Sequence, residues 1–184
     1  MSLFDDLMDL NYDLICKALD IDPATKTQNI LPLSYSESPA GLKNPHADYV
    51  FYIVQFDDSG INRQIDDITA PHPDITLVTR KIQYVRNLRF IWQIYGDDGF
   101  EWADTLRTQL LDSDVVRNML AGNGISLITD VPEAVGPIPE KIGQQWYKRY
   151  DLYAKLNQMV TKTTTLPAIA STNIIIETEE GVEA

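Results

Sequence analysis

The first twenty residues place apolar side chains at helical spacing. Between Leu3 and Leu19 the apolar residues recur every three or four positions, which puts them on one face of an α-helix. Ser2 is positioned to cap this helix, and acidic residues in its first turn stabilise the positive end of its dipole. We expect the helix to end before Pro23, because the residue that precedes a proline disfavours helical geometry.

Three apolar runs in the first half of the chain predict strands. Residues 49–56 are almost continuously apolar, β-branched or aromatic, which is typical of a strand buried on most of both faces. Residues 75–86 predict a second strand. Residues 88–95 predict a third, because core and mixed positions alternate there with a period of two.

Two helices and two more strands are expected in the second half. Asp98 and Glu101 have the spacing of a capping box, which would start a helix that runs to about Leu111 and buries Phe100. A short helix over 114–120 and a brief strand over 125–129 follow. The last predicted strand is long, from Gln144 to about Val160, and alternation puts Trp146 and Tyr150 on one face, together with Lys148.

This order of elements favours an α+β fold. Strands spaced so closely leave no room for helical crossovers, so the sheet is expected to be mostly antiparallel. We predict a single domain over residues 1–160, in which four to five strands pack against the N-terminal helix and the central helix pair. The proline-rich segment 20–45 is expected to form an extended loop, either on its own surface or at an interface.

Residues 161–184 are expected to form a C-terminal arm or tail. A polar spacer over 161–167 precedes an isolated apolar segment at 173–176, which nothing else in the tail could cover. Two interpretations stay open: the segment adds a strand to the edge of its own sheet, or it adds one to a neighbouring subunit.

Composition excludes several classes of protein. The 184 residues include 15 Lys and Arg against 27 Asp and Glu, and 15 − 27 gives a formal charge of −12. Such acidity argues against a free nucleic-acid binder, which needs a basic surface to displace phosphate counterions. One cysteine, Cys16, cannot form an intrachain disulfide. The acidic start and the lack of a long apolar run argue against a secreted or membrane protein.

Candidate catalytic chemistry is sparse. The two histidines, His46 and His72, lie beside prolines and are expected in surface loops, and no nucleophile, zinc or phosphate-loop motif is present. A metal-dependent enzyme could use Asp97, Asp98 and Glu101 as oxygen ligands. Helix capping and solvation explain the same residues, so we expect no cofactor and no enzyme. Cys16 is expected to be structural.

Charge is segregated along the chain. Basic residues gather on the predicted strands, whereas the acidic ones gather in the first helix, the loop at 57–67 and the tail. Unlike patches of this kind could set the register between subunits, although two solvated faces would also explain them. The candidate interface residues are Arg80, Lys81, Arg86, Arg89, Tyr147, Arg149, Tyr153, Ile174, Ile175 and Ile176.

Three stretches in the C-terminal half resemble the bacteriophage neck terminator proteins, relatives of the tail terminators of long-tailed phages. They are the aromatic strand and Gly-Asp turn at 90–99, the start of a helix at 102–108, and the aromatic-basic strand at 145–154, which follows a loop containing Val131-Pro132. The first half resembles the family only in the order of its elements.

The resemblance implies a structural virion protein of the phage neck, assembled in the host bacterial cytoplasm. Family members form a homo-oligomeric ring, usually of six copies, that caps the tail tube, ends its polymerisation and joins it to the head connector or head-completion protein. DNA would pass through the lumen without specific binding. Another connector, tail-completion or tail-tube component remains an alternative, as do the metal-dependent enzyme and a small host-encoded binding module.

Overall fold

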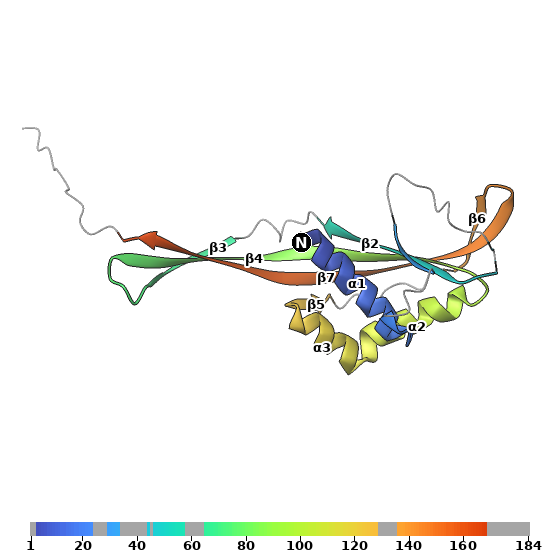
Figure 1. Ribbon diagram of the computed structural model, residues 1–184, viewed down its shortest axis with the longest axis horizontal. Helices are drawn as coiled ribbons and strands as arrows, with labels where there is room; N and C mark the ends of the chain where they lie inside the picture. The colour runs from blue at the N-terminus through green and yellow to red at the C-terminus, as the bar shows by residue number, and fades with distance from the viewer. Residues whose placement is uncertain are drawn as a thin grey trace, which may run out of the picture. The chain divides into compact units, whose positions relative to one another are not determined.

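The computed structural model describes residues 3–23, 29–33, 44, 46–57, 65–128 and 136–168. Three helices and seven strands occupy these ranges (Figure 1). The helices are α1 (Leu3–Ala18), α2 (Gly99–Asp112) and α3 (Asp114–Gly122). The strands are β1 (Ile30–Pro32), β2 (Tyr49–Asp57), β3 (Ile65–Pro71), β4 (Leu77–Tyr95), β5 (Ile125–Leu127), β6 (Ile138–Ile142) and β7 (Gln145–Pro167).

The strands form one sheet. Neighbours follow the order β1-β2-β4-β7-β5, with β3 paired to β4 and β6 paired to β7. β1 is parallel to β2, whereas β2 with β4, β5 with β7 and β6 with β7 are antiparallel. The predicted α+β class and mostly antiparallel sheet are therefore confirmed. The strand count is higher than expected, because β1, β3 and β6 are short or polar and carry little apolar periodicity.

The chain groups into two compact units. Residues 1–64 and 84–160 form the first unit, and residues 65–83 and 161–184 form the second, so β4 and β7 contribute to both. The three helices and the buried core belong to the first unit. In the second unit β3 and the described end of β7 are exposed along their whole length.

The core of the first unit lies between the helices and one face of the sheet. Alternate positions of β2, β4 and β7 point toward the helices, as a strand period of two requires. Figure 1 shows α1 crossing the strands, with α2 and α3 beside it. The main contributors from the sheet are Val50, Tyr52, Val54, Leu88, Phe90, Trp92, Ile94, Tyr150, Leu152, Ala154 and Leu156. The helices contribute Leu7, Leu10, Leu14, Ile15, Leu106, Leu110, Val116 and Leu120.

Strand boundaries differ from the sequence prediction in two places. The two strands expected at 75–86 and 88–95 are one strand, β4, which continues without a break through Asn87. The expected polar spacer at 161–167 is the end of β7, and directly after it the Ala168 amide donates a hydrogen bond to the Thr76 carbonyl, one residue before β4. Threonine is β-branched and favours strands, so a polar run of this composition does not break the sheet.

The helix starts also differ in detail. Asp98 precedes α2 but makes no capping hydrogen bond with its side chain, so the predicted capping box is not formed. The backbone amide of Asp98 instead donates to the carboxylate of Asp48, at 2.9 Å. At α3 a cap is present, because the hydroxyl of Ser113 accepts from the amide of Val116. Ser2, the cap proposed for α1, lies outside the described residues.

Phe100, which was predicted to be buried, is exposed, and so is Trp146. Phe100 on α2 is 53% exposed and Trp146 on β7 is 65% exposed. In the first turn of α2 the buried position is taken by Gly99, which lies against Tyr150 and Ile94. No helix in the described ranges is long and apolar enough to cross a membrane.

Candidate functional site

The face of the sheet opposite the helices carries a partly buried charge network. The hydroxyl of Tyr95 donates to the carboxylate of Glu140, at 2.7 Å, and the guanidinium of Arg149 lies 3.1 Å from the same carboxylate. Arg149 also contacts Asp151, with Nε at 2.9 Å from Oδ1 and Nη2 at 3.0 Å from Oδ2. The three elements β4, β6 and β7 are therefore joined through Glu140, which contacts both Tyr95 and Arg149.

The pKa values in this network follow from burial and charge. Burial raises the pKa of the Tyr95 hydroxyl, and its hydrogen bond to Glu140 raises it further. Burial acts to lower the pKa of Arg149, but the charges of Asp151 and Glu140 outweigh burial, and the pKa is raised. Arg149 is thus a permanent cation whose charge is neutralised within its own chain.

Tyr147 belongs to a small second core on this face. Its ring packs edge-on to Tyr95 with 6.4 Å between centroids, and Tyr95 packs in the same way against Phe51 at 5.6 Å. Tyr147 is only 4% exposed. It holds the start of β7 against β4 and β2. If Tyr147 affects an interface, it does so indirectly, by fixing the position of the β6–β7 hairpin.

Arg86 and Arg89 each lie over aromatic rings. The guanidinium of Arg89 is 5.5 Å from the centre of the Tyr153 ring, and that of Arg86 is 5.4 Å from the Phe56 ring. Arg86 also donates to the hydroxyl of Tyr84 at 3.2 Å. The geometry is that of cation–π contacts, worth about 0.5–1 kcal/mol where they are exposed. Strand alternation puts these two arginines on opposite faces of the sheet, so they do not form one basic patch.

The second unit contains the other two predicted basic residues. Arg80 on β4 holds the carboxylate of Asp67 on β3, with Nε at 3.0 Å from both carboxylate oxygens. The hydrogen bond from Arg80 lowers the pKa of Asp67. Lys81 is half-buried on the adjacent position. Ile174, Ile175 and Ile176, the remaining predicted interface residues, lie outside the described residues.

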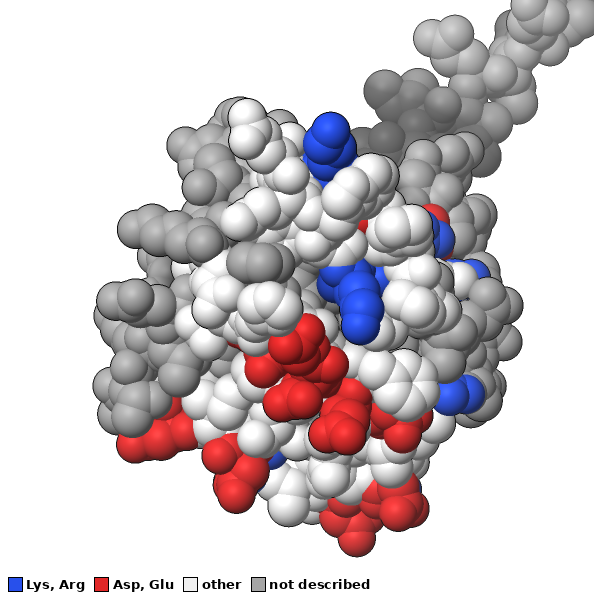
Figure 2. Space-filling model, turned by 90° about the vertical axis from the view of Figure 1, so that its right-hand side faces the viewer, with Lys and Arg blue, Asp and Glu red and all other residues white. Residues whose placement is uncertain are grey.

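The acidic cluster at the start of α2 has structural partners. The carboxylate of Asp97 lies 2.9 Å from Nδ1 of His46, and Asp48 accepts the Asp98 amide. Burial raises the pKa of Asp48. Figure 2 shows this end of the first unit, where acidic side chains crowd the lower half of the view. Within the described part of the chain, no group of three or more His, Cys, Asp and Glu side chains could hold a metal ion.

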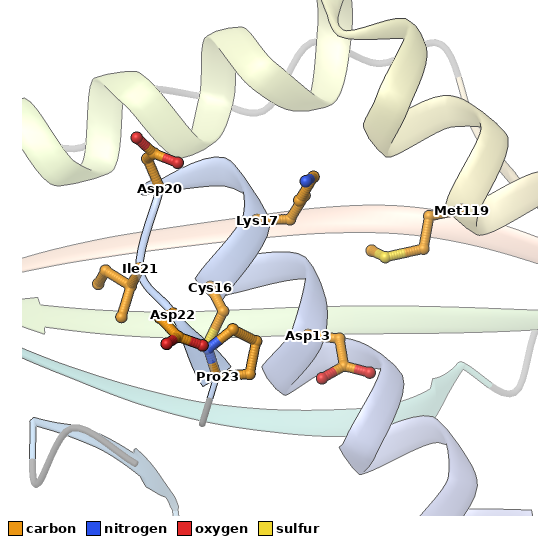
Figure 3. A pocket seen from close by; sticks show the side chains of 8 residues that line it. All are labelled: Asp13, Cys16, Lys17, Asp20, Ile21, Asp22, Pro23 and Met119. Carbon is orange, nitrogen blue, oxygen red and sulfur yellow. The ribbon is translucent and has the colours of Figure 1, made fainter. Parts of the chain in front are cut away.

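A pocket of about 490 Å³ lies at the end of α1 (Figure 3). Met119 of α3 lines one side, and the last turn of α1 with the residues after it lines the rest. Cys16 is fully buried there and its pKa is raised by burial, so its thiol is protonated and unreactive at neutral pH, as the sequence predicted. Asp13, Asp20 and Asp22 outnumber Lys17 among the lining residues, so the described lining of the pocket is acidic.

Sequence reasoning identified some of these side chains and missed others. It selected Arg149, but not Glu140 or Asp151, because the pairing of β6 with β7 that brings them together cannot be read from spacing. It also placed Trp146 on the same face of β7 as Tyr150 and Leu152, which are buried. The alternation of β7 was the available signal, but alternation does not show where the covering helices end.

Comparison with known proteins gives one family. The sequence profile of the phage neck terminator protein family matches residues 6–180. No curated protein matches the chain at a significant level. The match includes most of α1, the whole described sheet and both central helices, so it covers the first half as well as the C-terminal stretches that carry the resemblance.

Proposed function

Because the chain belongs to the phage neck terminator protein family, we propose that it forms a homo-oligomeric ring, expected to contain six copies, that caps the tail tube. The ring would end tube polymerisation and join the tail to the head connector or head-completion protein. The family match over residues 6–180 is the observation that carries this proposal. Family membership implies a structural protein at the neck of the virion.

Features of the fold support an assembly role. Many of its ionic and aromatic contacts brace strands against each other, as in the network of Arg149, and none of them arranges groups for catalysis in the described ranges. Large apolar side chains stay exposed at positions scattered over both units, including Ile65 at 61%, Ile75 at 91% and Trp146 at 65%. Single exposed apolar side chains are ordinary on protein surfaces, so these residues are available for subunit contacts but do not by themselves mark one.

A closed ring needs two different surfaces on each subunit. One surface meets the left neighbour and the other meets the right neighbour, so the contact is heterologous and closes by rotation. We propose that Arg89 and Tyr153 on the face of the sheet opposite the helices, Arg86 on the helix side, and Arg80 and Lys81 in the second unit contribute to such contacts. The C-terminal segment from Ile174 to Ile176 would add a strand to a neighbour.

DNA would pass through the ring without being gripped. The formal charge of −12 gives the subunit a net repulsion for phosphate, and an acidic lumen would keep the passage free. We expect no shift of duplex DNA by the purified protein in gel electrophoresis at 0.15 M salt. Tight, salt-sensitive binding would contradict the conduit role.

The decisive experiment is to image phage particles that lack this chain. Loss of a terminator should give overlong or unattached tails, and a plasmid copy of the gene should restore normal particles. Particles with normal attached tails would overturn the proposal. Imaging of the purified chain bound to isolated tail tubes should show a ring at the tube end.

The role of the C-terminal segment is tested by truncation after Ala168. The cut leaves β7 intact, because that strand ends at Pro167. If the segment crosses to a neighbour, the truncated chain should fold normally but assemble poorly. Normal assembly would assign the contact to other surfaces.

A further inference from the structure

The β6–β7 hairpin exposes a tryptophan between two lysines. Trp146 is 65% exposed, and exposed tryptophans are the commonest anchors of protein–protein contacts. In the hairpin register Trp146 lies opposite Lys141, and Lys148 lies opposite Pro139. Residues opposite each other in a ladder share a face, so Lys141, Trp146 and Lys148 lie on one side of the hairpin. We call these three residues the hairpin face.

The hairpin face carries two positive charges and no carboxylate. Glu140, the acidic residue of β6, lies opposite Tyr147 and points to the other side, where it accepts from Tyr95 and pairs with Arg149. No ion pair is recorded for Lys141 or Lys148 in the part of the chain that the structure describes. A partner for this face therefore needs an acidic surface with an apolar group beside it.

The first two turns of α1 have that chemistry. Leu3, Asp6 and Asp9 are spaced by three residues, which puts them along one side of the helix. Leu3 is 46% exposed and both aspartates are exposed. No ion pair or hydrogen bond is recorded for Asp6 or Asp9 within the described ranges. We call these three residues the helix face.

The two faces belong to the same unit but do not meet within it. Figure 1 shows the β6–β7 hairpin and the first turn of α1 apart from each other. One chain therefore presents a basic, aromatic surface and an acidic, apolar surface at separate places. This is the arrangement that a head-to-tail contact between identical subunits requires.

We propose that the hairpin face of one copy binds the helix face of the next copy. Trp146 would pack against Leu3, and Lys141 and Lys148 would face Asp6 and Asp9. The inference rests on the proposed ring and names one of its contacts. Charge complementarity selects a second copy as the occupant, because the chain itself supplies the surface that the hairpin face lacks.

Charge reversal tests the contact. One variant carries Lys141→Glu and Lys148→Glu, and the other carries Asp6→Lys and Asp9→Lys. Each is expressed in cells infected with phage that lack the gene, and tailed particles are counted by electron microscopy. Each variant alone should lose tailed particles, because its two faces then repel each other. Co-expression of the two variants should restore particles, since the faces of alternating copies attract again in a ring with an even number of subunits.

Trp146→Ala should also lose assembly, whereas Phe100→Ala, a second exposed aromatic residue, should keep it. Circular dichroism and thermal melting of each purified variant confirm that the chain folds. The inference is overturned if either reversed variant assembles alone, or if two folded variants fail to complement each other. If the variants still form a ring but the ring no longer binds the tail tube, the hairpin face contacts the tube instead.

If phage that lack the gene form normal tails, the proposed function itself is wrong.

Discussion

The indole N–H of Trp92 on β4 donates a hydrogen bond of 2.8 Å to the side-chain oxygen of Asn11 on α1. Both residues are fully buried. The bond fixes the position of the first helix over the centre of the sheet, because a buried N–H without a partner is costly. The tryptophan thus accounts for the side-chain oxygen of an asparagine that is buried among the apolar residues of α1.

Asn11→Ala should destabilise the protein. The change leaves the Trp92 N–H unsatisfied and opens a small cavity, which together cost about 1–3 kcal/mol in free energy of unfolding. Urea denaturation followed by tryptophan fluorescence measures the loss. The matched control is Asn11→Ala in a Trp92→Phe background, where no donor remains. An equal cost in both backgrounds would show that the hydrogen bond contributes nothing.

Arg149→Met should weaken the attachment of the β6–β7 hairpin. The Arg149 side chain is 22% exposed and its loss leaves the carboxylates of Glu140 and Asp151 close together without a cation. Breaking a buried pair costs about 3–5 kcal/mol, and partial exposure places this site near the lower limit. Thermal and urea unfolding measure the change. Lys148→Met, on the exposed side of the same strand, should change stability by less than about 0.5 kcal/mol.

Gly96→Ala should be among the most damaging single changes. Gly96 has φ of +117°, which L-residues rarely adopt. An added Cβ would also lie 2.7 Å from Asp48 Cα and 2.9 Å from the Ala47 carbonyl oxygen, both backbone atoms that cannot move aside. We expect a loss of about 3 kcal/mol or more, or insoluble protein. Gly136→Ala, where nothing lies within 4 Å of the new methyl group, should be tolerated.

Asp48 should contribute a pH dependence of defined sign. Burial raises its pKa above the ordinary value of 3.8, and Asp98 and Asp97 add repulsion. Because the folded state binds the proton more tightly than the unfolded state, this contribution favours folding below the ordinary pKa. It is lost as pH rises through the folded pKa.

Asp48→Asn removes this titration and keeps an oxygen that accepts the Asp98 amide. As pH rises above the ordinary pKa of 3.8, the variant should therefore lose less stability than the wild type, as measured by urea unfolding at several pH values. Asp112→Asn, on the exposed end of α2, is the control. If Asp48→Asn leaves the pH dependence of stability unchanged, Asp48 is not the group responsible for it.

Parts of the candidate site were predictable from spacing. Alternation along β7 correctly places Arg149 and Tyr153 on one face of the strand and Tyr150 and Leu152 on the other. The core position of Trp92 follows in the same way from the period of two along β4. The partners of Arg149 were not predictable, because Glu140 reaches it only through strand pairing. Arg86 and Arg89 are close in sequence, yet alternation assigns them to opposite faces, so a cluster of charges in the sequence was not a patch on the surface.

The sequence by itself determined the helices, the principal strands and the apolar residues that fill the core, because helical and strand periods are local properties of the chain. Only the tertiary structure decided which of those faces are covered. Tyr147 is buried because Phe51 and Tyr95 contact it across the sheet. Trp146 is exposed because no described helix reaches the start of β7, where this residue lies. The capping box predicted at Asp98 is absent for a similar reason. The Asp98 amide donates to the carboxylate of Asp48, fifty residues away, and no local sequence pattern contains that partner.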